Sequence, residues 1–350
     1  MKVFLKRILE FTVLMVLLAV LADMGVSHGL RKTERGHFFT MNALMNKKMD
    51  ADIVILGNSR AAGSYHPQIL DSILHVNSWN LGVSGQPFGV SWLRWELYRR
   101  KNNTPKLIIV NVDYNELAMV SNGFEKEQYY PYISDSLVRP YLDLYGFSWA
   151  DKYVPMYRYR GDYKLIVIGL TELFGIRHDT KGNYYKGYSN SNEPWDGFRL
   201  EYKLRDGDIE GNTDRQAVLL LERLLEQAGD GGCQVLFVYA PLYVRLKEHL
   251  EEEETLRIYR ELSDKYGVQF LDYSQMKICS DTSYFRDANH LNSEGAELFS
   301  ISLAHAIDSL YFFNLKAGND ENHYACFWNS ARGYQDVPVG PRVSKVSRSF

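Results

Sequence analysis

Short apolar runs alternate with amphipathic stretches through the middle and C-terminal parts of this 350-residue chain. Apolar runs of about four to eight residues are typical of buried strands, and apolar positions three and four apart are typical of helices. The expected strands lie at 52–57, 76–82, 106–113, 234–240 and 268–272. The expected helices lie near 66–75, 87–101, 213–228, 245–266 and 293–310. This alternation predicts an α/β fold, a three-layer α/β/α sandwich around a mostly parallel five-stranded sheet.

The first 26 residues have the pattern of a membrane signal. Three basic residues, Lys2, Lys6 and Arg7, precede an apolar run over 11–22. That run alone fits a signal-peptide core, whereas 8–26 approaches the roughly 20 residues that a membrane span needs. We expect 1–26 to be an uncleaved signal anchor, with cleavage and secretion as the alternative. The basic flank favours a single-pass topology with the main domain outside the cytoplasm, in the periplasm or the extracellular space.

The rest of the chain divides by composition. Residues 27–50 are expected to be a juxtamembrane connector, and 51–312 the main domain. Within that domain 121–212 interrupt the alternation, are rich in tyrosine, and predict a helical insertion. The aromatic rings of this insertion have two possible roles. They either stack on the sugar rings of a carbohydrate ligand, or pack an inserted cap while their hydroxyl groups stay exposed to solvent. The tail at 313–350 lacks periodicity and is expected to be disordered.

Two short segments far apart in the sequence offer the parts of a nucleophilic site. Ser59 follows the expected strand 52–57 through a tight turn, which is how a buried strand delivers a hydroxyl to the carboxyl edge of a sheet. Asp287 stands three residues before His290, so that its carboxylate can orient the imidazole. A serine hydroxyl needs such a positioned base before it attacks. Ser59, His290 and Asp287 are therefore a candidate nucleophile, base and orienting acid.

These segments resemble the conserved blocks of the SGNH, or GDSL-like, hydrolases. Gly57-Asn58-Ser59 matches the first block of the family, and 287–292 reads Asp-Ala-Asn-His-Leu-Asn, like its last block. Between them, Gly82 and Asn115 stand where the family places oxyanion-hole donors, although Asp113 replaces the glycine of the Gly-x-Asn-Asp block. The resemblance implies an SGNH or flavodoxin-like fold and a serine esterase or acyltransferase.

The resemblance also implies a substrate class. Membrane-tethered relatives commonly act on O-acyl groups of cell-surface polysaccharides, so an acylated carbohydrate or another small ester is the expected substrate. Water or a sugar hydroxyl would accept the acyl group, and a membrane acyl-donor protein is a candidate partner. The alternative is a catalytically inactive protein with the same fold that binds a glycan or serves as a scaffold in a cell-envelope assembly.

Charge and cysteine content narrow the function further. The formal net charge is −3, and no dense Lys/Arg stripe is present, which argues against nucleic acid as a partner. The three cysteines, Cys233, Cys279 and Cys326, form no close pair, and the histidines lack ligand spacing. We therefore expect neither a metal nor another cofactor.

Overall fold

The computed structural model describes residues 1–46, 49–119, 125–176, 184–190, 192–205, 209–210, 213–311 and 342–343. The chain divides into two compact units. The N-terminal unit comprises Met1–Lys48, Glu96–Lys101 and Gly123–Gly182, and the sheet unit comprises Met49–Trp95, Asn102–Asn122 and Asn183–Phe350. The predicted insertion 121–212 is thus shared between the two units.

A parallel sheet forms the centre of the sheet unit. Its strands are β1 (Ile53–Leu56), β2 (Ser78–Asn80), β3 (Leu107–Val112), β7 (Gln234–Tyr239), β9 (Gln269–Asp272) and β12 (Arg342–Val343). The order is β12-β9-β7-β3-β1-β2, and all neighbours are parallel except β12 and β9. From β1, the chain first adds β2 on one side and then β3 on the other side. The strand order therefore reverses at β1. Open parallel sheets bind ligands beyond the carboxyl ends of the strands at such a switch point.

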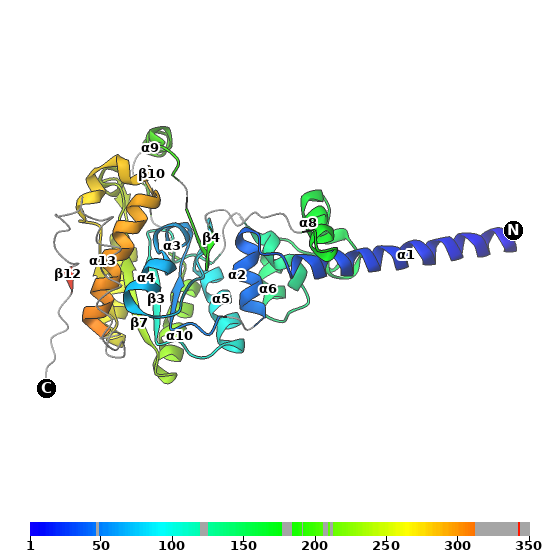
Figure 1. Cartoon of the computed structure of the whole chain (residues 1–350), viewed down its shortest axis with the longest axis horizontal. Coiled ribbons are helices and arrows are strands. Elements are labelled where there is room, and N and C mark those ends of the chain that lie inside the picture. Colours follow the sequence, from blue (N-terminus) through cyan, green and yellow to red (C-terminus); the bar gives the residue numbers. More distant parts are fainter. Residues whose placement is uncertain are drawn as a thin grey trace. The chain divides into compact units, whose positions relative to one another are not determined.

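Helices cover both faces of this sheet, which confirms the predicted three-layer α/β/α sandwich. Helix α13 (Ser293–Tyr311) contacts both α3 (Ser59–Ser64) and α4 (Pro67–Leu74), and the three share a core with alternate strand residues such as Ile53 and Ile109 (Figure 1). On the other face lie α5 (Phe88–Lys101), α10 (Arg215–Asp230) and α12 (Glu253–Tyr266). There the Phe237 ring of β7 meets the edge of Tyr259 on α12. Parallel strands buried on both faces need apolar runs rather than alternation, as the sequence has.

The predicted helix 245–266 is interrupted. Its residues form α11 (Val244–Lys247), the short strand β8 (Leu250–Glu251) and α12, and β8 pairs with β6 (Ile209–Glu210). The break follows from Glu252, which is buried and accepts hydrogen bonds from the Tyr239 hydroxyl and from Lys247 Nζ, both at 2.5 Å. A buried carboxylate needs such partners, so the chain leaves the helical path here.

The remaining elements of the sheet unit are short. They are β4 (Tyr184–Tyr185), β5 (Tyr188–Ser189), α9 (Gly197–Leu204), η3 (Lys277–Ser280), η4 (Thr282–Tyr284), β10 (Phe285–Asp287) and β11 (His290–Leu291). Strands β10 and β11 form an antiparallel hairpin, as do β4 and β5.

The N-terminal unit is helical. It contains α1 (Lys2–Leu30), α2 (Gly36–Met45), η1 (Lys126–Tyr132), α6 (Val138–Leu144), α7 (Trp149–Tyr153), η2 (Tyr157–Tyr159) and α8 (Tyr163–Leu173). Helix α1 continues beyond the predicted boundary at residue 26, and α2 occupies part of the predicted connector 27–50. Among the described residues, α1 alone is long and apolar enough to cross a membrane. The predicted tail 313–350 lies outside the described residues except for 342–343.

Candidate functional site

Ser59 begins α3 directly after β1, through a turn that requires glycine. Gly57 has a φ of +149°, and a Cβ atom there would lie 2.7 Å from Asn111 Cβ and 2.8 Å from Ala61 Cβ. Asn58 then caps the helix, because its Oδ1 accepts a hydrogen bond from the Arg60 N–H at 2.9 Å. The turn thus brings Ser59 to the carboxyl end of β1, beside the switch point of the sheet.

Asp287 and His290 face each other across the β10–β11 hairpin. His290 Nδ1 lies 2.8 Å from Asp287 Oδ1 and 3.0 Å from Oδ2. The backbone N–H groups of Asn289 and His290 also donate to Oδ1, at 2.9 and 3.1 Å. The carboxylate is therefore held by hydrogen bonds within its own turn.

The structure joins this hairpin to the Ser59 turn, 231 residues away in sequence. Ser59 Oγ lies 2.8 Å from His290 Nε2. An ionised carboxylate only accepts hydrogen bonds, so the ring proton is on Nδ1. The Nδ1–H group donates a hydrogen bond to Asp287. Nε2 is then the acceptor for the Ser59 hydroxyl. This is the arrangement in which an imidazole can remove a proton from serine.

The pKa of Asp287 is lowered from its usual range. Burial acts in the opposite direction and favours the neutral acid. The hydrogen bond and charge of His290, the N–H of Asn289 and the charge of Arg286 outweigh that effect. Asp287 is therefore ionised at neutral pH and supplies a negative charge behind the imidazole.

A buried polar network lies beneath the Ser59 turn. Asn58 Nδ2 donates to Asp113 Oδ2 at 2.9 Å, and the Asn58 backbone N–H donates to Glu116 Oε2 at 3.1 Å. Arg60 lies 3.5 Å from Asp113 and donates to the Ala240 carbonyl at 2.6 Å. The turn is thus tied to the ends of β3 and β7 as well as to its own strand.

Two ionisable groups of this network, Glu116 and Arg60, are fully buried and have shifted pKa values. Burial raises the pKa of Glu116 well above its usual value, and the charge of Asp113 adds to this. Burial by itself lowers the pKa of Arg60. Asp113 and other acidic groups outweigh this effect and raise the pKa above its usual value, so Arg60 stays charged. Sequence reasoning assigned no role to Arg60, Asp113 or Glu116. The available signal was the position of Asp113 and Glu116 just after an apolar strand, at the edge where a site forms.

Asn190 connects the helix that begins at Ser59 with the strand that carries His290. The sequence did not indicate a role for this residue. Its Nδ2 donates to the Gly63 carbonyl of α3 at 2.7 Å and to the Leu291 carbonyl of β11 at 3.1 Å. The side chain is buried. Asn190 therefore ties the helix that begins at Ser59 to the strand that carries His290. Its place within an irregular, polar segment offered no sequence signal for this contact.

The structure places the two predicted oxyanion donors less favourably. The Gly82 N–H donates to Asn80 Oδ1 at 2.9 Å, so this donor is engaged within its own loop. Asn115 lies in the turn after β3 with an exposed side chain. Neither residue takes part in the hydrogen bonds that join Ser59, His290 and Asp287.

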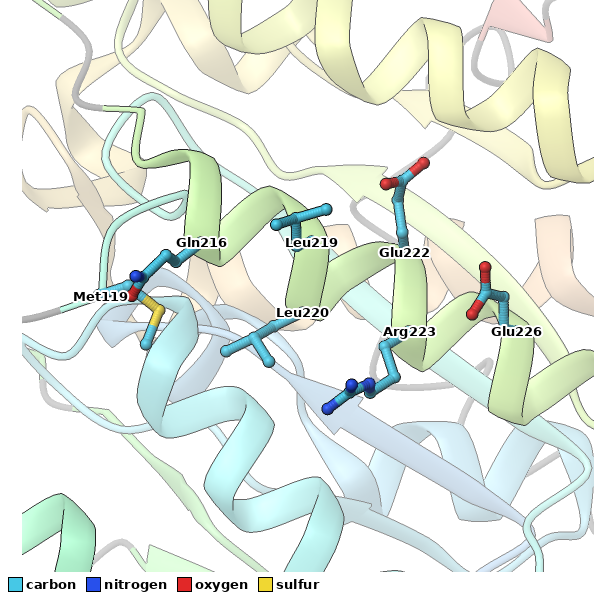
Figure 2. Close-up of a pocket in the computed structure, with 7 residues that line it drawn as sticks. All are labelled: Met119, Gln216, Leu219, Leu220, Glu222, Arg223 and Glu226. Atoms are coloured by element: carbon cyan, nitrogen blue, oxygen red, sulfur yellow. The ribbon is translucent and has the colours of Figure 1, made fainter.

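A separate surface pocket lies along α10. Figure 2 shows its lining side chains, with Met119 beside the helix. They are Met119, Gln216, Leu219, Leu220, Glu222, Arg223 and Glu226. Glu222 pairs with Lys265 at 2.7 Å, and none of the seven residues belongs to the Ser59 site. In the described part of the chain, no group of three or more His, Cys, Asp or Glu side chains could hold a metal ion.

Comparisons with known proteins give a structural likeness but no match to a family model or a curated protein. A crystal structure described as that of a "putative acylhydrolase" from Bacteroides fragilis is similar, with 12% identity and a TM-score of 0.36. The match covers 74% of this chain and 86% of that one. Because a TM-score this low carries no functional argument, the function has to be argued from the residues of the site.

Proposed function

We propose that this chain is a serine esterase or O-acyltransferase of the SGNH type, in which Ser59 forms an acyl-enzyme. The observation that supports this most strongly is the unbroken chain of hydrogen bonds from Ser59 Oγ to His290 Nε2 and from His290 Nδ1 to Asp287, each 2.8 Å long. A serine hydroxyl becomes a nucleophile when a base and an orienting acid are arranged in this way.

The reaction has two steps. In the first, His290 Nε2 takes the Ser59 proton while Oγ attacks the ester carbonyl, and His290 then returns the proton to the departing alcohol oxygen. In the second, water or a sugar hydroxyl gives its proton to His290 and attacks the acyl-enzyme, which restores the Ser59 hydroxyl. Asp287 stabilises the imidazolium that forms in each step.

Negative charge on the carbonyl oxygen also needs donors. The Ser59 N–H is at the first position of α3, where backbone N–H groups have no acceptor within the helix. We assign the other donors to the Gly82 N–H and the Asn115 side chain, as the family resemblance implies. Gly82 would then exchange its hydrogen bond with Asn80 for one with the substrate. Each such donor is worth about 2.7–4 kcal/mol in comparable sites.

A fluorophosphonate probe tests this proposal directly. The purified full-length protein should be labelled at Ser59 at neutral pH, and Ser59→Ala should not be labelled. His290→Ala should lose labelling and turnover as well, and the double variant should be no worse than either single one, because the two residues act as a unit. Ser64→Ala is a matched control, since Ser64 is a buried serine of the same helix. A folded protein that is neither labelled nor active on short acyl esters contradicts the proposal.

The long apolar helix α1 supports a membrane-tethered form of this enzyme. We propose that α1 is an uncleaved anchor and that the sheet unit lies outside the cytoplasm, where acylated cell-surface polysaccharide is the proposed substrate and a membrane protein the proposed acyl donor. A cysteine in place of the exposed Leu219 should react with a membrane-impermeant thiol reagent in intact cells. Reaction only after lysis contradicts this topology.

A non-catalytic glycan-binding or scaffold protein with the same fold is the second candidate. The hydrogen bond between the Gly82 N–H and Asn80 Oδ1 favours it, because that donor is already engaged. Glycan binding that survives Ser59→Ala, together with no labelling of the wild type, would support this candidate over the enzyme.

A further inference from the structure

Helix α8 of the N-terminal unit carries an apolar stripe that faces away from the protein. Among its eleven residues only Lys164 and Glu172 are charged. Tyr163, Val167 and, at the end of the helix, Phe174 are exposed, the last by 74%. Their spacing of four and seven residues puts them on one face. Exposed apolar surface of this kind indicates a contact with a partner or a membrane.

The opposite face of α8 packs tightly against the C-terminal part of α1, as Figure 1 shows. A Cβ atom at Gly29 would lie 1.8 Å from the Gly169 carbonyl oxygen, so the two backbones touch. A Cβ atom at Gly25 would lie 3.1 Å from Leu173 Cδ2. Because Leu173 meets α1 at Gly25, the C-terminal end of α8 lies level with that residue, with the exposed Phe174 and Ile176 just beyond it.

The length of α1 indicates the depth in a bilayer at which Gly25 and the C-terminal end of α8 lie. A helix crosses the hydrocarbon core with about 20 residues. Counted from Ile8, the first residue after the basic cluster, such a span ends near Ser27. The exposed apolar residues of α1 lie within or before this span, and burial begins at Val26. Gly25 therefore marks the boundary between hydrocarbon and headgroups, and the end of α8 lies at that boundary.

The C-terminal half of this span contains one acidic residue, Asp23, and the N-terminal unit supplies its partners. Asp23 Oδ2 lies 2.5 Å from Arg158 Nη2, and Asp23 Oδ1 accepts the Met156 N–H at 2.9 Å. Acidic side chains at membrane depth are found paired in this way. The segment around η2 is therefore also level with the end of the span. Arg158 contacts the adjoining α7, on which Trp149 and Tyr153 are both 68% exposed.

We propose that these exposed side chains form a second membrane contact, an apolar collar around the end of α1 that inserts into the interfacial layer of the phospholipid bilayer. The collar consists of Trp149, Tyr153, Phe174 and Ile176. Tryptophan and tyrosine are the residues enriched at this depth, and Lys152 lies between Trp149 and Tyr153, where it can pair with headgroup phosphates. The collar holds the N-terminal unit against the membrane surface. The proposal rests on the proposed anchoring role of α1.

Quenching of tryptophan fluorescence by brominated lipid tests the collar. The full-length protein is reconstituted into phosphatidylcholine vesicles with and without bromine on the acyl chains. Three single variants each add one tryptophan at an exposed apolar position: Leu17→Trp in α1, Phe174→Trp in the collar, and Leu219→Trp on α10. The emission that each variant adds to the wild type is compared between the two kinds of vesicle.

We expect the added emission to be quenched for Leu17→Trp and Phe174→Trp and unchanged for Leu219→Trp. Trp149→Phe should remove a quenched component from the wild type. Quenching at position 17 without quenching at 174 or 149 overturns the collar, retains the anchor, and leaves this face to a protein partner. No quenching at any of the positions refutes the anchor itself. Phe174→Trp keeps an aromatic side chain at an exposed site, so that folding is not at risk.

Discussion

Replacing Asp287 by Asn removes the negative charge of this side chain but keeps its size and its hydrogen bonds to the backbone. Asp287 Oδ1 accepts the backbone N–H groups of Asn289 and His290, and an asparagine Oδ1 can keep both hydrogen bonds. The amide Nδ2 then takes the position of Oδ2, 3.0 Å from His290 Nδ1. A donor then faces the Nδ1–H group where an acceptor stood, beside the remaining contact to Oδ1 at 2.8 Å. This repulsion disfavours the tautomer with the proton on Nδ1 and favours the one with the proton on Nε2, which cannot accept the Ser59 proton.

The expected loss is large because the substitution removes two effects at once. It disfavours the active tautomer, and it deletes the negative charge that stabilises the imidazolium. The same change in a well-studied triad lowers kcat by about 10⁴, which corresponds to about 5.5 kcal/mol in the activation free energy. We expect a loss in kcat of this order for Asp287→Asn, with a small effect on the Michaelis constant.

Hydrolysis of a short activated ester provides the assay, with the rate of fluorophosphonate labelling as a second measurement. Asp281→Asn is the matched control: Asp281 caps η4 through the Ser283 N–H, six residues before Asp287, and asparagine caps equally well. This control should retain wild-type activity. If Asp287→Asn loses less than about tenfold in kcat while folded, Asp287 does not orient the base and the proposed triad is wrong.

Three further predictions concern the supports of the site. Gly57→Ala should lower the free energy of unfolding by about 1–3 kcal/mol, measured by urea denaturation, because the added methyl meets two side chains at a strained φ; an unchanged midpoint contradicts the tight turn. Asn190→Ala removes the hydrogen bonds to two buried backbone carbonyls and should cost about 1–3 kcal/mol in stability and lower kcat; unchanged kcat would show that this tie does not position the site. The lowered pKa of Asp287 stabilises the fold above the unfolded-state pKa of about 3.9, and this contribution is lost as pH falls through the folded-state pKa. The stability difference between wild type and Asp287→Asn should therefore shrink in acid, and a pH-independent difference contradicts an ionised Asp287.

The sequence by itself determined the sheet and the local chemistry. Runs such as 107–110 are apolar throughout, and in a chain of alternating elements a parallel strand covered on both faces requires this. The pairing of Asp287 with His290 was also readable, because a spacing of three residues brings the two side chains together in any tight turn. The Gly57 turn was readable for the same reason, since its geometry depends on adjacent residues.

Only the tertiary structure decided what lies around these local features. The 2.8 Å contact between Ser59 and His290 joins residues 231 apart, and no periodicity records such a distance. The burial of Arg60 with Asp113 could not be predicted from charged residue types, which are usually exposed. Likewise, Glu252 breaks a helix that its own sequence favours, because burial with Tyr239 and Lys247 outweighs local propensity. Local patterns specify elements and turns, whereas the partners of buried polar groups come from distant segments that meet only when the chain is folded.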